Sequence, residues 1–152
     1  MRRMLYLGLT ERLKELKEEN GNPVIRHIDL WNEQVEFIEQ EEPFDTPAVF
    51  IEFRPVQWRT MGGNAQQADV PFRLHVVTTW KGSARQGSHF QQDSLERFDL
   101  LDKIDAWLFN FGIRDEKESV CMTRRTGNST NHNHEELVED ISDFTCLVTQ
   151  SY

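Results

Sequence analysis

The chain has 152 residues, of which 38% are apolar and 28% charged, and its aromatic residues are ten Phe, four Trp and two Tyr. This length fits one domain better than two, and the apolar content excludes a generally disordered chain. With 17 basic and 26 acidic residues the net charge is −9, which repels phosphate backbones and anionic lipids and disfavours nucleic-acid binding as the main activity. We expect a single domain over residues 1–152.

The lack of a recognisable membrane span or secretory signal and the pattern of cysteines both favour the cytoplasm. No stretch approaches the ~18 consecutive apolar residues of a membrane helix, and no apolar secretory run follows Arg2 and Arg3. The only cysteines, Cys121 and Cys146, have neither metal-site spacing nor a disulfide-rich context. We therefore expect a cytoplasmic protein that does not contact membranes, with both cysteines acting as small core residues.

The N-terminal region alternates between two patterns. The helical spacing of Leu5, Leu9, Leu13 and Leu16 predicts an amphipathic helix, which should end at the Gly21 and Pro23 turn. Two short alternating runs, residues 24–31 and 35–38, then predict a hairpin. Residues 39–47 are rich in acids and proline and should form a loop.

Two longer strands are predicted at residues 48–58 and 70–80. In the first, Val49, Ile51 and Phe53 share one face, whereas the opposite face carries Phe50, Glu52, Val56 and Trp58. In the second, Leu74 lies on one face and His75 on the other. Residues 59–69 contain two adjacent glycines and few apolar side chains, so we expect a protruding loop there.

The strongest helical pattern covers residues 93–111. Asp93 and Ser94 can cap this helix, and we expect it to pack on the sheet with Leu101 and Ile104 fully buried. Two more strands, residues 119–125 and 141–149, should flank a polar loop at 126–133 and a short acidic segment at 135–140. If these strands pair about Asn133, Cys121 faces Cys146. The predicted order is α-β-β-β-β-α-β-β, an α+β fold with an antiparallel or mixed sheet.

No arrangement of residues predicts catalysis. His132, His134, Glu135 and Glu136 offer metal-binding groups, but histidines two apart do not match a zinc helix and no third ligand is fixed. We expect a solvated loop there, no metal and no cofactor. The scattered histidines His27, His75 and His89 are expected to be structural, since no nucleophile is placed beside them by the local sequence.

The order of the elements resembles the tail-terminator and tail-completion proteins of tailed bacteriophages, as encoded in prophages. The parts that carry the resemblance are the opening helix at residues 5–13, the proline-led strand at 47–53, its neighbour at 72–77 and the packing helix at 95–108. The resemblance implies a structural protein rather than an enzyme. It also implies a homohexameric ring that would cap the tail tube and join it to the head connector, first in the host cytoplasm and then in the virion. DNA would only pass through the lumen, without specific binding.

Apolar side chains that one domain cannot cover should form the contact between copies. The candidates are Phe50, Val56, Trp58, Met61 and Trp80. Two other classes remain open. A monomeric ligand-binding module would place Trp58 or Trp80 over a small molecule. A small metal-dependent enzyme would use His132, His134 and Glu135.

Overall fold

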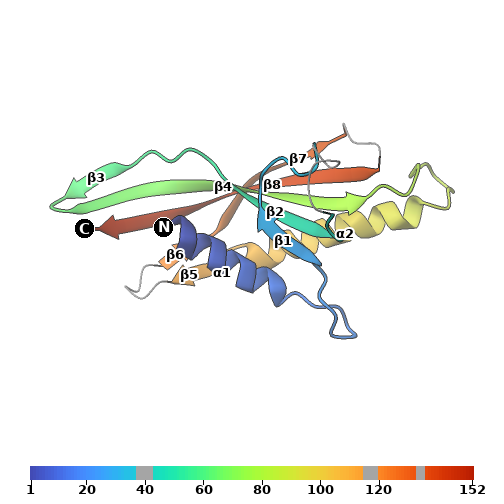
Figure 1. Cartoon of the computed structure of the whole chain (residues 1–152), viewed down its shortest axis with the longest axis horizontal. Coiled ribbons are helices and arrows are strands. Elements are labelled where there is room, and N and C mark those ends of the chain that lie inside the picture. The colour runs from blue at the N-terminus through green and yellow to red at the C-terminus, as the bar shows by residue number, and fades with distance from the viewer. Residues whose placement is uncertain (37–42, 115–119, 133–135) are drawn as a thin grey trace.

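The computed structural model describes residues 1–36, 43–114, 120–132 and 136–152, and it confirms the α+β class. Figure 1 shows two helices on one side of a long, twisted sheet. The elements in the described part of the chain are α1 (Arg2–Lys14), β1 (His27–Leu30), β2 (Ala48–Phe53), β3 (Arg59–Gly62), β4 (Ala65–Thr79), α2 (Gln91–Leu108), β5 (Gly112–Arg114), β6 (Val120–Met122), β7 (Arg124–Asn131) and β8 (Leu137–Ser151). No helix in these ranges is long and apolar enough to span a membrane.

The main sheet has six strands. Its order is β1-β2-β4-β8-β7, and β3 pairs with the first part of β4. All pairs are antiparallel except β1 with β2, while β5 and β6 form a separate two-stranded ribbon. β4 and β8 have 15 residues each, pair along their whole length and span about 50 Å at ~3.4 Å per residue.

The main core lies between the sheet and the helices. Leu5, Leu9 and Leu13 of α1 and Ile104 and Leu108 of α2 are fully buried against the same face of the sheet, which we call the helix face. The two helices are joined by polar contacts as well. The Arg12 guanidinium lies 3.8 Å from the Trp107 ring centroid, and the Trp107 indole N–H donates to the Arg12 carbonyl over 2.7 Å.

A smaller core covers part of the opposite face, which we call the outer face. Phe50 is fully buried there with Ala48, Val77 and Val35, and Trp31, Phe44 and Leu137 pack around them. Residues of the connection between β1 and β2, together with Val77 of β4 and Leu137 of β8, therefore cover the apolar side chains that the sequence analysis left exposed on this face. The expectation that Phe50 is available to a second chain is wrong.

The predicted hairpin at residues 24–38 is also wrong. β1 pairs in parallel with β2, and residues 34–36 form a turn instead of a returning strand. Residues 37 and 38 lie outside the described ranges. Side chains of β1 alternate in the sequence because successive residues point to opposite sides of the sheet. Ile28 packs against the main core, whereas His27 lies beside Phe50 on the outer face.

The predicted loop at residues 59–69 is a hairpin. β3 and the start of β4 are joined through Gly63 and Asn64, and Gly62 and Gly63 have φ angles of 115° and 56°, a region that favours glycine. The strand predicted at 48–58 ends instead at Phe53, shortly before Pro55. The start of β4 was not predicted as a strand because it contains polar residues such as Gln66 and Gln67. Its pairing with β3 and β8, rather than burial in a core, holds it in place.

Helix α2 is correctly placed, but its ends and burial differ from the prediction. It begins at Gln91 and ends at Leu108, so Asp93 is within the first turn. Ile104 is fully buried, whereas Leu101 is only half-buried. Leu95 and Phe98, 48% and 49% exposed, lie on the solvent side of the first half of the helix.

The C-terminal part contains four strands where two were predicted. The polar residues 126–131 belong to β7, and the acidic residues 137–140 begin β8. Cys121 lies in β6, and the residue opposite Cys146 in the sheet is Val70. The two buried thiols nevertheless form a hydrogen bond. The predicted proximity of the cysteines is thus confirmed, but the strand pairing behind it is wrong.

Candidate functional site

The five residues proposed for the copy-to-copy contact do not form one surface. Phe50 is buried in the smaller core, and Val56 and Trp58 pack against the main core. Met61 and Trp80 are 59% and 44% exposed. Met61 is beside the start of β4 and Trp80 directly follows its end, so the length of the sheet separates them.

The metal hypothesis gains no support from the described residues. His132 is exposed just after β7, and Glu136 is exposed just before β8, whereas His134 and Glu135 lie outside the described ranges. In the part of the chain that the structure describes, no group of three or more histidine, cysteine or acidic side chains is arranged to hold a metal ion.

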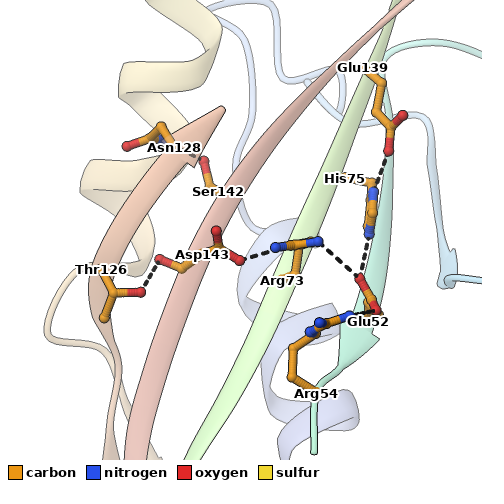
Figure 2. Close-up of polar contacts among 9 residues, drawn as sticks. All are labelled: Glu52, Arg54, Arg73, His75, Thr126, Asn128, Glu139, Ser142 and Asp143. Carbon is orange, nitrogen blue, oxygen red and sulfur yellow. Dashed lines mark hydrogen bonds and ion pairs between the residues drawn. The ribbon is translucent and has the colours of Figure 1, made fainter. Parts of the chain in front are cut away.

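A polar network crosses the outer face of the sheet. His75 of β4 has one ring nitrogen, Nδ1, bonded to Glu139 of β8 and the other, Nε2, 3.0 Å from Glu52 of β2 (Figure 2). Only 4% of the His75 side chain and 2% of the Glu139 side chain are exposed. Two carboxylates on one imidazole require both ring nitrogens to donate, or one carboxyl group to keep its proton.

Arginines extend this network towards solvent. Arg54 donates to Glu52 over 2.6 Å, and Arg73 donates to Asp143 over 2.8 Å while lying 3.8 Å from Glu52 (Figure 2). Burial raises the pKa of Glu52, but hydrogen bonds and charges from Arg54 and His75 outweigh it and hold the pKa below its ordinary value. The Asp143 hydrogen bond raises the pKa of Arg73. Glu52 is therefore a carboxylate at neutral pH.

This network is suited to holding strands in register rather than to catalysis. Both nitrogens of His75 are engaged by carboxylates, and the Trp31 ring is stacked on its face with a centroid distance of 3.7 Å and an interplanar angle of 2°. The imidazole thus has no free nitrogen for a substrate or a metal. The sequence placed Glu52 and His75 on the second face of their strands, but Glu139 was missed because its segment was interpreted as acidic and loop-like.

The second candidate is an extension of the sheet that we call the arm. It consists of β3, residues 65–69 of β4 and residues 147–151 of β8, and it projects beyond α1 and the β5–β6 ribbon (Figure 1). All four residues of β3 are exposed, and Leu147 of β8 is 45% exposed. The strand predicted at 141–149 includes part of the arm, but β3 and residues 65–69 of β4 were missed because strands held mainly by their paired neighbours show no apolar alternation.

Two cavities border the sheet. One, of about 580 Å³, lies between the first half of α2 and the end of β4, and its lining includes Trp80, Leu100 and Arg97. The other, of about 330 Å³, lies on the arm beside Leu147 and Thr149.

Comparison with known proteins adds no assignment. No protein-family model matches the chain, and no curated protein matches it.

Proposed function

We propose that the protein is a tail-terminator or tail-completion subunit that assembles into a ring, caps the tail tube and joins it to the head connector. The observation that supports this proposal best is the arm. Strands β4 and β8 continue well past the helices, into a region where Gln, Thr and Ser side chains predominate, Leu147 is exposed, and only Ala68 and Val148 are buried. Such an extension adds little to a monomer's core but offers backbone and side chains to other chains.

A ring follows if neighbouring copies bind through different surfaces. A contact between unlike patches repeats around a closed ring, whereas a contact between like patches stops at a two-fold dimer. The two ends of this molecule are unlike, because the arm is at one end and the apolar residues of α2 are at the other. Six copies is the number that the resemblance implies.

The charge fits a channel for DNA. A net charge of −9 disfavours adhesion of a phosphate backbone to the subunit. In this proposal DNA moves through the lumen without specific contacts, the partners are tail-tube and head-connector proteins, and no chemical reaction is needed. The protein would occupy the host cytoplasm before it enters the virion.

The test combines mass and shape. Light scattering of the purified protein should give a multiple of the monomer mass, and negative-stain images should show rings with a central hole. Gold-labelled antibody on particles that carry the protein should decorate the junction of head and tail. A monomer at every concentration that can be reached, or a dimer with no larger species, would contradict the proposal.

A ligand-binding module is the second candidate, and the cavity beside Trp80 favours it. Its volume of about 580 Å³ is within the ~300–1,000 Å³ range of small-molecule pockets. Trp58, the other tryptophan proposed for this role, packs against the main core and is not available. A monomer whose Trp80 fluorescence responds to a small-molecule library, with loss of the response in Trp80→Leu, would favour this alternative over the ring.

A further inference from the structure

Strand β8 has an unpaired edge over its last six residues. Its pairing with β7 ends at the Arg124–Thr145 partners, whereas its pairing with β4 continues to Ala65 and Ser151. In the described ranges, no strand pairs with the second edge of residues 146–151. This edge is therefore open along most of the arm.

The peptide groups on this edge can be assigned from one hydrogen bond. The Tyr152 N–H donates to the Asn64 carbonyl over 3.1 Å, so Tyr152 is directed towards β4. Peptide groups of successive strand residues point to opposite sides, and the β4–β8 register has no shift. The N–H and C=O groups of Leu147, Thr149 and Ser151 consequently point away from β4, ready to accept another strand.

The edge is open because hydrogen bonds of Thr123 hold the segment before β7 against the end of α2 and away from the edge of β8. The Thr123 hydroxyl donates to the Leu108 carbonyl, and the Thr123 N–H donates to the Phe111 carbonyl over 3.0 Å. Thr123 is fully buried, and it fixes the junction of β6 and β7 to the end of α2. β6 therefore pairs with β5 and does not continue β7 along β8.

A groove accompanies the open edge. The cavity of about 330 Å³ lies there, with Met122 and Arg124 at the point where β6 leaves and with Leu147 and Thr149 on the strand itself. The groove therefore offers backbone partners to an incoming strand, and its lining mixes the apolar side chains of Met122 and Leu147 with the charged side chains of Asp69 and Arg124.

We propose that this edge of β8 binds strand β3 of a second copy, in parallel orientation; this contact rests on the proposed ring. β3 is antiparallel to β4, and β4 is antiparallel to β8, so β3 and β8 run in the same direction. Rotation about a ring axis along the strands preserves that direction. The exposed Met61 of β3 would supply an apolar side chain for the groove beside Leu147 and Met122.

The proposal commits to one geometry. β3 lies on one side of the arm and the open edge of β8 on the other, so each copy has both halves of the contact. Repetition joins the arms into one continuous sheet. A two-fold dimer would instead pair β8 with β8 of the second copy in antiparallel orientation.

Disulfide trapping separates these geometries. Neighbouring strands lie about 4.8 Å apart, within the ~4.4–6.8 Å between Cα atoms that a disulfide requires. Thr60→Cys should be combined in turn with Leu147→Cys, Thr149→Cys and Ser151→Cys to sample the register. Under oxidation, at least one double variant should give a ladder of covalent oligomers, with the junction peptides identified by mass spectrometry.

The single variants are the matched controls. Each should give no ladder, and a covalent dimer of Thr149→Cys alone would show the two-fold contact and overturn the proposal. If rings are seen in images but none of the three double variants crosslinks, this contact is wrong and the proposed function is unaffected. If neither rings nor crosslinks form, both fail.

A proline variant tests the backbone directly. Thr149→Pro removes an outward N–H that the monomer does not use, a change that an edge position tolerates. The far-ultraviolet circular dichroism should remain that of the monomer, while the assembled fraction should fall at least tenfold. Thr149→Ala keeps the N–H and should assemble as the original chain does. Equal assembly of the proline and alanine variants would contradict the proposal.

Discussion

The two halves of the β4–β8 pair share their backbone pairing but differ in their neighbours and in how much of their surface is covered. In the half nearer the helices, residues 70–79 and 137–146, β2 and β7 flank the pair, the helix face is covered and the outer face is covered in part. In the arm, residues 65–69 and 147–151, the same ladder continues with β3 on one side and an open edge on the other. A strand pair can thus extend well beyond its core, provided that its own hydrogen bonds are complete.

The side chains of the two halves follow this difference. The covered half has Val70, Phe72 and Leu74 on the helix face and the ionic network around His75 on the outer face. In the arm, polar residues such as Gln66, Gln67 and Thr149 are mixed with two exposed apolar side chains, Met61 and Leu147, and only Ala68 and Val148 are buried. Stability should therefore come from the first half, and assembly from the second.

The largest contrast between the halves should come from apolar truncation. Ile104→Ala removes a fully buried side chain beneath the covered half and should lower the free energy of unfolding by ~2–5 kcal/mol. Leu147→Ala on the arm should change it by no more than ~0.5 kcal/mol, as expected of surface positions. Urea denaturation of both variants and of the original chain measures the change in the free energy of unfolding. Equal losses would show that the arm contributes to the core.

A smaller effect is expected from the ionic network. Glu139→Gln leaves the shape of the buried side chain but removes the carboxyl group that bonds to His75, and it should cost ~1–3 kcal/mol. Glu52→Gln should cost less, because Glu52 is more exposed. The same denaturation assay compares the two. A larger loss of unfolding free energy for Glu52→Gln would contradict this ranking and show that the more exposed carboxyl group contributes more to stability.

Alkaline pH should destabilise the contact between β6 and β8. The hydrogen bond with Cys121, together with burial, raises the pKa of the Cys146 thiol far above its ordinary value. The unfolded chain ionises this thiol first, so its contribution is fully present below about pH 8.5 and falls by up to ~1.4 kcal/mol per pH unit above it. Unfolding measured from pH 7 to 10 should show a shallower fall for Cys146→Ala. Parallel profiles would exclude the thiol as the cause.

The smallest expected effect is at acid pH. Since the pKa of Glu52 is lowered in the folded protein, its carboxylate stabilises the fold above the ordinary Glu value, and this stability is lost as the pH falls through the folded value. Glu52→Gln should therefore show a weaker loss of thermal stability between pH 5 and 3 than the original chain. The matched variant Asp45→Asn, at an exposed loop position, should leave the acid profile unchanged.

The local sequence determined the parts of this protein that have a strong period. The spacing of Leu5, Leu9 and Leu13 gave α1, and the alternation around Val49 and Leu74 gave the centre of β2 and β4, because one buried face imposes a helix or strand period on the residues that fill it. The α+β class followed from these elements alone. The chemistry of the outer face was only half visible, since Glu52 and His75 were assigned to it but Glu139 was not.

Only the tertiary structure decided the remaining features. β7 and the arm are strands because neighbouring strands satisfy their peptide groups, and this requires no apolar pattern. β1 lies parallel to β2 instead of in a hairpin, and Phe50 is covered by segments distant from it in the sequence. Thr123, buried against the end of α2, decides where β8 loses its neighbour. These features depend on contacts between segments that are distant in the sequence, and the periodicity of a single segment does not show which other segments it contacts.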